Sequence, residues 1–225
     1  MTLLCEKQNP TEYTEYDPEG VMTPSASAVN IYVPSGETIP QSPSRMVDAA
    51  FDDVCTLEPE DWGMQFDFIL SSGTWTTPRS IVGVWDTSSS SAYLTATMML
   101  ATYNQLAFAL TTIGHGANWS GLYAKDTTYT LKLYSYSEAP LFHAKLEIYD
   151  GGTLQETISG YTTGYGDPVT ADMRVRFAEF AGQVNGDDWD ETISDLWLPV
   201  RPPVLPMIRK HGTLGEKRIL EGGNF

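Results

Sequence analysis

Apolar and polar residues alternate in several short segments of the chain between residues 61 and 200. The clearest alternation covers residues 142–149, where Phe142, Ala144, Leu146 and Ile148 alternate with His143, Lys145, Glu147 and Tyr149. Because successive side chains of a strand point to opposite faces of a sheet, each such segment predicts a strand with one face toward a core. The same alternation recurs in residues 63–70, 91–99, 104–113, 128–137, 153–159 and 171–180.

Turn-forming residues separate these segments. Clusters rich in Gly, Ser, Thr, Asn and Asp lie between them, and no segment from 61 to 200 has the apolar period of a helix. About nine short strands joined by such turns predict an all-β fold. We expect a two-sheet antiparallel β-sandwich of the jelly-roll type.

The sequence Asp150-Gly151-Gly152 lies between two of the predicted strands. Two glycines supply backbone positions of positive φ, which a tight hairpin turn requires. An alternative is that Asp150 binds calcium, but calcium takes six to eight oxygen ligands and no dense series of Asp and Asn flanks this residue. The hairpin is therefore the favoured interpretation. We expect no cofactor, with calcium at Asp150 as the alternative.

The two ends of the chain differ from this middle part. Residues 1–60 are acidic and rich in Pro, Ser and Thr, so they predict an extended arm that Tyr13, Tyr16, Ile31 and Tyr32 could anchor on a partner. Within the arm, residues 44–57 have apolar positions on one helical face and predict one short helix. Residues 201–225 predict an extended basic tail whose candidate partner-binding residues are Arg209, Lys210, Lys217 and Arg218.

Charge is distributed unevenly along the chain. The net charge is −16, yet the last 25 residues hold five basic and two acidic residues, which leaves 8 basic and 27 acidic residues in the first 200. Such an acidic body argues against nucleic acid as a partner. The charge serves solubility, or the basic tail docks on an acidic neighbour such as another copy of the chain.

The chain shows no signal of secretion or of membrane insertion. The N-terminus lacks a basic region followed by an apolar run, and no apolar stretch approaches the ~18 residues that a membrane span needs. Cys5 and Cys55 lie 50 residues apart and are expected to be free thiols. We therefore expect a protein made in the cytoplasm of a host cell without a signal peptide.

No catalytic constellation stands out. A glycoside hydrolase needs two positioned carboxylates, and no Glu-x-Asp-x-Glu triplet on one strand supplies them. His115, His143 and His211 have no metal-binding spacing, and no Gly-x-Ser-x-Gly elbow exists. Aromatic residues beside polar ones in turn-like segments are better candidates, because exposed indole rings bind sugars. The candidate glycan-binding residues are Trp119, Asn118, Trp189, Asp188 and Asp190.

The order of the predicted strands resembles a laminin-G-like, concanavalin A-like domain. The segments "YTLKLYSY", "LFHAKLEIYDGGTLQETISG", "MRVRFAEFAG" and "ISDLWLPV" are similar to the second half of such a domain, and "WGMQFDFIL" through "QLAFALTT" to its first half. The resemblance covers about residues 61–200. It implies a two-sheet jelly roll and no particular activity, because this fold hosts many functions.

The arm, the sandwich and the tail together resemble a bacteriophage virion component. We therefore expect a non-enzymatic structural protein of the virion that decorates or cements the capsid or joins tail parts. Its partners would be other virion proteins and copies of itself. The alternative is a lectin-like module that binds glycans of a host surface, and a glycoside hydrolase is a third hypothesis.

Overall fold

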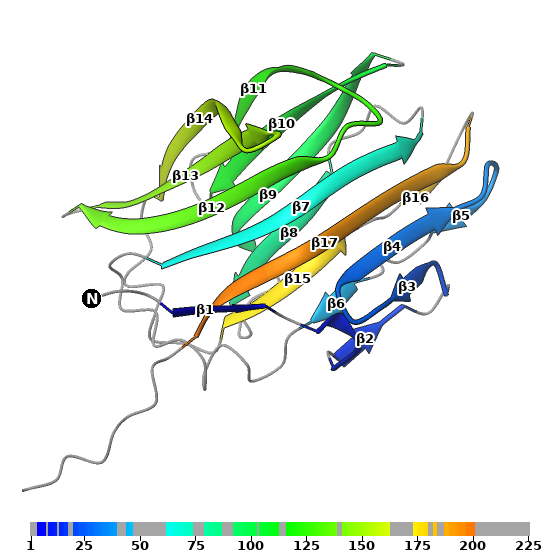
Figure 1. The fold of residues 1–225 in the computed structure, drawn as a ribbon, viewed down its shortest axis with the longest axis horizontal. Helices are drawn as coiled ribbons and strands as arrows, with labels where there is room; N and C mark the ends of the chain where they lie inside the picture. Colours follow the sequence, from blue (N-terminus) through cyan, green and yellow to red (C-terminus); the bar gives the residue numbers. More distant parts are fainter. Residues whose placement is uncertain are drawn as a thin grey trace, which may run out of the picture.

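The computed structural model is nearly all β-strand (Figure 1). It describes residues 4–7, 9–12, 14–17, 20–39, 44–46, 62–73, 79–86, 92–102, 104–112, 116–138, 141–162, 173–179, 182–183 and 187–200. Apart from the short 3-10 turn η1 (Pro10–Glu12), the elements of these residues are strands. No helix within these ranges is long and apolar enough to cross a membrane.

Two large antiparallel sheets contain most of the strands. Sheet A has the order β14 (Thr153–Thr162), β13 (Leu141–Asp150), β12 (Tyr129–Glu138), β7 (Trp62–Ser72), β17 (Trp189–Val200), β4 (Ala28–Val33), β3 (Met22–Pro24), and β1 (Leu4–Lys7) also pairs with β17. Sheet B has the order β11 (Gly116–Ala124), β10 (Gln105–Thr112), β9 (Ala92–Thr102), β8 (Arg79–Asp86), β15 (Met173–Glu179), β6 (Ser44–Met46), β2 (Thr14–Tyr16). A small third sheet pairs β5 (Thr38–Ile39) with β16 (Gly182–Gln183).

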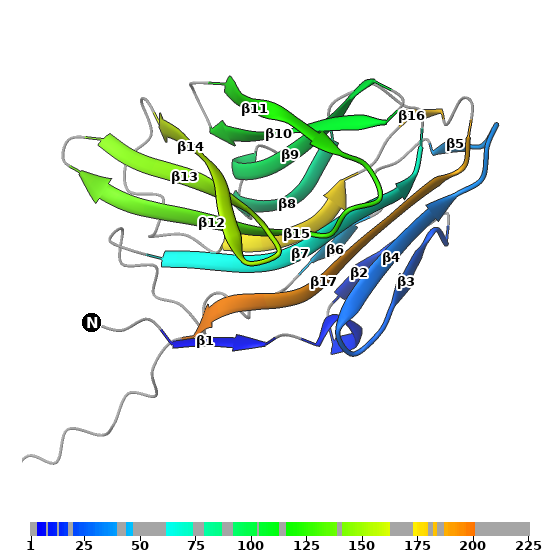
Figure 2. The ribbon, with the colours of Figure 1, turned by 45° about the horizontal axis from the view of Figure 1, so that its top comes forward.

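The two large sheets pack face to face (Figure 2). The predicted two-sheet antiparallel β-sandwich is therefore confirmed. The predicted alternation is confirmed in β7 and β13. In β7, Met64, Phe66, Phe68 and Leu70 are buried, and in β13, Ala144, Leu146 and Ile148 are buried. Because these residues alternate with more exposed ones, sheet A has a core face and an outer face. In β10 both Ala107 and Ala109 are buried together with the larger residues of the other face, and Leu154 of β14 is exposed.

An aromatic cluster joins the two sheets in the core. The ring of Phe108 in β10 lies 5.9 Å from that of Phe68 in β7 and 5.5 Å from that of Tyr129 in β12, both edge to face. Tyr123 in β11 adds a third contact, with its ring 5.4 Å from Phe108. Such edge-to-face pairs add roughly 0.5–1.5 kcal/mol each beyond the burial of their surface. The cluster therefore stabilises the packing of sheet A against sheet B.

The segment predicted as an N-terminal arm contributes strands to both sheets. Val29, Ile31 and Val33 of β4 are almost completely buried, and β4 pairs with β17 over six residues. Prolines do not prevent this, because Pro24 lies on the edge strand β3 and Pro34 follows the end of β4. The sandwich thus begins well before residue 61.

The helix predicted over residues 44–57 begins in the structure as the strand β6 (Ser44–Met46), which pairs with β2 and β15. Residues 47–57 lie outside the described ranges. The tail of residues 201–225 and its four candidate partner-binding residues also lie outside them.

The hairpin predicted around Asp150 is confirmed. Asp150 pairs with Thr153, and the two residues between them, Gly151 and Gly152, have φ values of 52° and 81°. Two consecutive positive φ values match a type I′ turn, whose twist suits a two-residue hairpin. Within the described residues, no group of three or more His, Cys, Asp and Glu is placed to hold a metal ion.

Side chains close one side of the sandwich between β14 of sheet A and β10 and β11 of sheet B. Thr112 Oγ1 donates to the Tyr161 carbonyl at 2.8 Å, and Asn118 Nδ2 donates to the Ser159 carbonyl at 2.8 Å. A Cβ on Gly160 would lie 3.3 Å from the Leu110 side chain, so the glycine allows this close approach. We call this region the β14 seam. It holds the β13–β14 hairpin against the second sheet.

Candidate functional site

A group of polar side chains lies on the outer face of sheet A, on the neighbouring strands β12 and β13. Lys132 lies between the buried Leu131 and Leu133, and Lys145, Glu147 and Tyr149 alternate with the buried residues of β13. The strand register places Lys132 directly opposite Glu147. We call Lys132, Lys145, Glu147 and Tyr149 the lysine–tyrosine cluster. Alternation within each strand and the pairing of the two strands bring its members together.

Three contacts link the four side chains in series. The Tyr149 hydroxyl donates a hydrogen bond of 2.7 Å to Glu147 Oε2. Lys145 Nζ lies 3.3 Å from Glu147 Oε1. Lys132 Nζ lies over the ring of Tyr149, 4.4 Å from its centroid, which is the geometry of a cation–π contact. Glu147 thus orients both a phenol and an ammonium group.

The electrostatics of the cluster keep Tyr149 protonated at neutral pH. The hydrogen bond to Glu147 is the main cause that raises the pKa of the Tyr149 hydroxyl above its usual value, with smaller contributions from burial and from the charge of Glu147. A protonated phenol remains a hydrogen-bond donor. The cluster therefore presents an oriented hydroxyl, whose proton is donated to Glu147 in the hydrogen bond and whose oxygen can still accept, beside two ammonium groups and a carboxylate.

Further polar groups extend this face to both sides. Toward β7, the Thr130 hydroxyl donates to Asp67 Oδ1 at 2.6 Å. Toward β14, the rings of His143 and Tyr161 lie 6.3 Å apart in a tilted arrangement. The face thus combines cations, acceptors, donors and aromatic rings over four neighbouring strands. Such a combination can hold a polyhydroxylated or carboxylated ligand.

The structure places the five predicted glycan-binding residues in three different settings. Trp119 lies on the edge strand β11 and is 38% exposed, while Asn118 faces β14 and bonds to it. Trp189 is fully buried, against Gly73, so its indole offers no surface to a sugar. The prediction failed for Trp189 because position 189 lies on the core face of β17. The Asp residues around it in the sequence are typical of an exposed loop and gave no sign of this burial.

Asp188 and Asp190 lie near β4 and hold parts of it in place. Asp188 accepts hydrogen bonds from the Tyr32 hydroxyl at 2.6 Å and from the backbone N–H of Ser35 at 2.8 Å. These two bonds hold the pKa of Asp188 below its usual value, and the bond from Tyr32 is the larger cause. Asp190 accepts a hydrogen bond of 2.7 Å from the Asn30 amide. The structure does not bring Trp119 to this pair.

The predicted partner-binding residues also separate. Ile31 is completely buried in the core, so it cannot anchor an arm on another molecule, whereas its neighbour Tyr32 is 45% exposed. Tyr16 lies in β2, and its side chain is not described. Tyr13 lies outside the described residues.

The lysine–tyrosine cluster was not identified from the sequence as a site. The alternation in β13 already predicted that Lys145, Glu147 and Tyr149 face outward. The missing information was the register with β12, which brings Lys132 beside them. A signal that could have found it is the matching outward position of Lys132 in the preceding predicted strand.

Comparison with known proteins rests on structure. No family model matches the chain, and no curated protein matches it by sequence. An endo-β-1,4-glucuronan lyase from the fungus Trichoderma reesei is 10% identical with a TM-score of 0.55, over 89% of this chain and 96% of that one. An alginate lyase from Pseudomonas aeruginosa is 11% identical with a TM-score of 0.51, over 83% and 88%. A Trypanosoma rangeli sialidase is 9% identical with a TM-score of 0.51, over 80% of this chain but 26% of that one.

These neighbours correct one prediction and confirm another. The prediction of a non-enzymatic structural virion protein is wrong, because the similar structures are carbohydrate-processing enzymes and nothing in the comparison indicates a virion component. The resemblance to a jelly-roll domain is confirmed. Similarity at these identities establishes the fold and not an activity. The chain is a jelly-roll β-sandwich that shares its fold with polysaccharide lyases of a fungus and a bacterium.

Proposed function

We propose that this chain processes a polysaccharide and binds it across the outer face of sheet A, at the lysine–tyrosine cluster. The observation that carries the proposal is the contact of Lys132, Tyr149, Glu147 and Lys145 on two paired strands. The enzymes that share the fold support processing rather than a purely structural role.

The cluster has the chemistry that sugar recognition requires. Sugar hydroxyl groups both donate and accept hydrogen bonds, and the cluster offers the Tyr149 hydroxyl, the Glu147 carboxylate and two ammonium groups. These groups are held by one another and by a rigid pair of strands. A site of fixed side chains loses little conformational entropy when it binds its ligand.

Two lysines on an otherwise acidic chain favour a polysaccharide that carries carboxylates. The first 200 residues hold 27 acidic and 8 basic residues, and Lys132 and Lys145 are two of those eight. Glucuronan and alginate are the polymers named for the two lyases of the same fold. An ammonium group that replaces its contact with Glu147 or Tyr149 by one to a ligand carboxylate forms a charge-assisted hydrogen bond.

The reaction to test is elimination. A base removes the proton beside a carboxylate whose charge is neutralised, the bond to the glycosidic oxygen breaks, and that oxygen takes a proton as an unsaturated sugar forms. Glu147 is the carboxylate that can take the first proton, and Tyr149, whose hydroxyl is bonded to Glu147, can give its own proton to the departing oxygen and recover one from Glu147. Lys132 and Lys145 are suited to neutralise the carboxylate of the sugar.

The proposal is tested by calorimetric titration of the full chain with polyglucuronate, alginate and an uncharged dextran, while ultraviolet absorbance monitors unsaturated products. We expect binding of an acidic polymer, and Lys132→Gln should weaken it about tenfold, because a hydrogen bond to a charged group is worth roughly 1.5–3 kcal/mol. Tyr149→Phe should abolish the unsaturated product while much of the binding remains.

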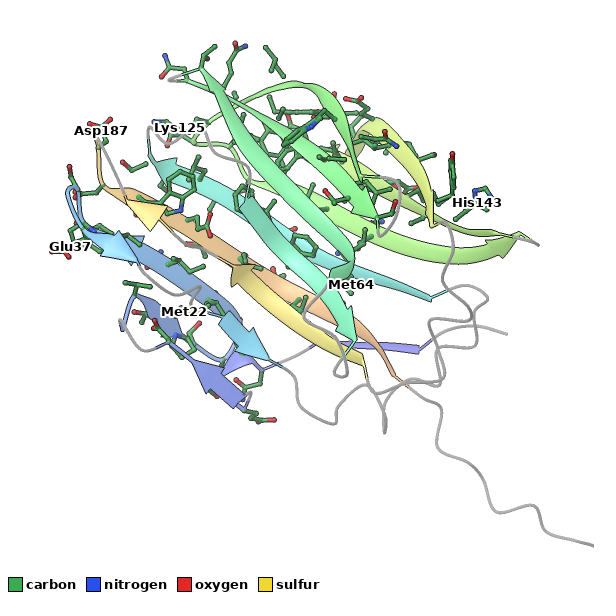
Figure 3. The ribbon with its side chains drawn as sticks, turned by 180° about the vertical axis from the view of Figure 1, so that it is seen from behind. Met22, Glu37, Met64, Lys125, His143 and Asp187 are labelled. Carbon is green, nitrogen blue, oxygen red and sulfur yellow. The ribbon has the colours of Figure 1, made fainter. Side chains whose placement is uncertain are left out.

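Lys125→Gln is the charge-matched control. Lys125 lies in the turn that precedes β12, at one end of the molecule (Figure 3), and is not a member of the cluster. We expect this variant to bind like the unmodified chain. Equal loss in Lys132→Gln and Lys125→Gln would contradict a local site and indicate only general charge. Binding without any unsaturated product would contradict the lyase reaction but not the binding.

A further inference from the structure

A second feature of the outer face of sheet A lies at its other side, on β4. Tyr32 is 45% exposed, whereas its neighbours Ile31 and Val33 are completely buried. Alternation therefore places the Tyr32 ring on the outer face. Four strand-to-strand steps separate β4 from β13, which is roughly 19 Å across the sheet. Tyr32 is thus well separated from the lysine–tyrosine cluster.

The Tyr32 ring is held in place although it is exposed. Its hydroxyl donates to Asp188 Oδ2 at 2.6 Å, and Asp188 Oδ1 accepts the backbone N–H of Ser35 at 2.8 Å. The carboxylate therefore links the tip of the ring to the turn that follows β4. An exposed aromatic ring whose orientation is already fixed loses little entropy when a ligand stacks on it.

Hydrogen-bonding groups surround this ring. Asp190 lies directly opposite Tyr32 in the strand register, and its Oδ1 accepts the Asn30 amide. A carboxylate has about four acceptor positions, so Asp188 and Asp190 each retain capacity for a ligand hydroxyl. The arrangement joins an aromatic surface to acceptors that do not move. This is the chemistry that binds a sugar ring, with its apolar face on the aromatic ring and its hydroxyls on the carboxylates.

The charge at this end of the molecule indicates which sugars fit. Figure 3 shows Asp187 and Glu37 at the same end, where Asp188 and Asp190 also lie. Lys125 lies at this end too (Figure 3), but the four carboxylates outnumber it. Like charges repel, so a sugar that carries a carboxylate is disfavoured here.

We propose that Tyr32, with Asp188 and Asp190, forms a second carbohydrate-binding site of this chain, specific for uncharged sugar rings. It goes beyond the proposed function, because it is separate from the lysine–tyrosine cluster and takes the opposite class of sugar. Asp188 and Asp190 keep the glycan-binding role that the sequence predicted for them. The aromatic partner is Tyr32 and not Trp189, whose indole is buried.

Titration of the full chain with uncharged oligosaccharides of glucose, mannose and galactose tests the site, followed by NMR spectroscopy or calorimetry. At least one series should bind, and Tyr32→Ala should weaken it about tenfold, since an aromatic stacking surface is worth about 1 kcal/mol or more. Asp188→Asn should also weaken it. Tyr32→Phe, which keeps the ring and loses the bond to Asp188, should lie between the unmodified chain and Tyr32→Ala.

Leu122→Ala is the matched control, because it removes a comparably exposed apolar side chain from the other sheet and belongs to none of the candidate sites. We expect it to bind uncharged oligosaccharides like the unmodified chain. The proposal is overturned if no uncharged oligosaccharide binds, or if Tyr32→Ala binds as well as Leu122→Ala. Binding of acidic polysaccharide to Tyr32→Ala, measured in the same preparation, reports on the lysine–tyrosine cluster separately and shows that the variant is folded.

Discussion

Burial separates the roles of two aromatic residues that lie close to the same pair of aspartates. Trp189 is fully buried and packs directly over Gly73, while Tyr32 is exposed and bonded to Asp188. A Cβ added at Gly73 would lie 2.5 Å from Cε3 of the indole. The glycine therefore leaves the space that the large Trp189 ring occupies.

Substitution of this glycine tests that packing. Gly73→Ala should lower the free energy of unfolding by about 1–3 kcal/mol, because an added methyl group forces the indole to move within a packed core. Gly73 also has φ = +145°, a backbone conformation that side chains disfavour. Urea denaturation measures the change.

Gly36→Ala provides the control for backbone strain alone. Gly36 has φ = +85°, and a Cβ there would meet no atom within 4 Å. We expect a smaller loss of stability than for Gly73→Ala. A loss in Gly36→Ala equal to that in Gly73→Ala would mean that strain, and not the contact with Trp189, decides the effect.

At the scale of elements, side-chain hydrogen bonds join β14 of sheet A to β10 and β11 of sheet B, with which β14 has no strand pairing. Besides the bonds of Thr112 and Asn118, Glu156 Oε2 accepts hydrogen bonds of 3.0 Å from both the Gly121 N–H and the Tyr123 hydroxyl. The pKa of the Tyr123 hydroxyl is raised above its usual value, mainly by burial and next by its hydrogen bond to Glu156. The hydroxyl therefore stays protonated and donates. Side chains that cap the edges of β14 and β11 also make them poor templates for another strand.

Loss of the Glu156 carboxylate should therefore loosen the β14 seam. Glu156→Ala removes two hydrogen bonds whose donors water can partly reach, and the net contribution of such a bond is about 0.5–1.5 kcal/mol. We expect faster amide hydrogen exchange in β14 and β11 and a lower free energy of unfolding.

Gln155→Ala is the control on the same strand, because the hydrogen bond that its side chain makes to the described residues is local, to the Thr153 carbonyl. Exchange in β14 should be nearly unchanged in that variant. Unchanged exchange in Glu156→Ala would show that Thr112 and Asn118 hold the seam without Glu156.

At the scale of the whole molecule, the chain cannot be divided at residue 61. Strands from residues 4–46 belong to both large sheets, and β4 supplies part of the common core. The buried side chains of β4 lie on the core face of sheet A beside those of β17 and belong to the common core of the sandwich.

A chain that begins at residue 61 should therefore fail to fold cooperatively. It lacks Val29, Ile31 and Val33, and removal of even one buried aliphatic side chain typically costs about 2–5 kcal/mol. Circular dichroism and thermal unfolding compare it with the full chain. Removal of residues 201–225 alone is the control. A sharp unfolding transition in the chain of residues 61–200 would contradict this view of the fold.

Much of the fold follows from patterns that are local in the sequence. The alternation in residues 63–70, 129–133 and 143–149 predicted strands and their core faces, and the two glycines after Asp150 predicted the hairpin. These features could be predicted because the pleat and the turn depend on neighbouring residues only. The same information failed for Trp189 and for the N-terminal strands, whose partners are distant in sequence.

The sequence by itself determined that the chain forms a β-sandwich, which residues of many strands face the core, and that its body is strongly acidic. The tertiary structure alone decided that Lys132 lies beside Tyr149, that Glu156 joins two sheets, and that Tyr32 rather than Trp189 is exposed beside Asp188. The physical reason is that alternation specifies a face of a strand but not its neighbours. Register and packing between distant segments bring side chains together into sites.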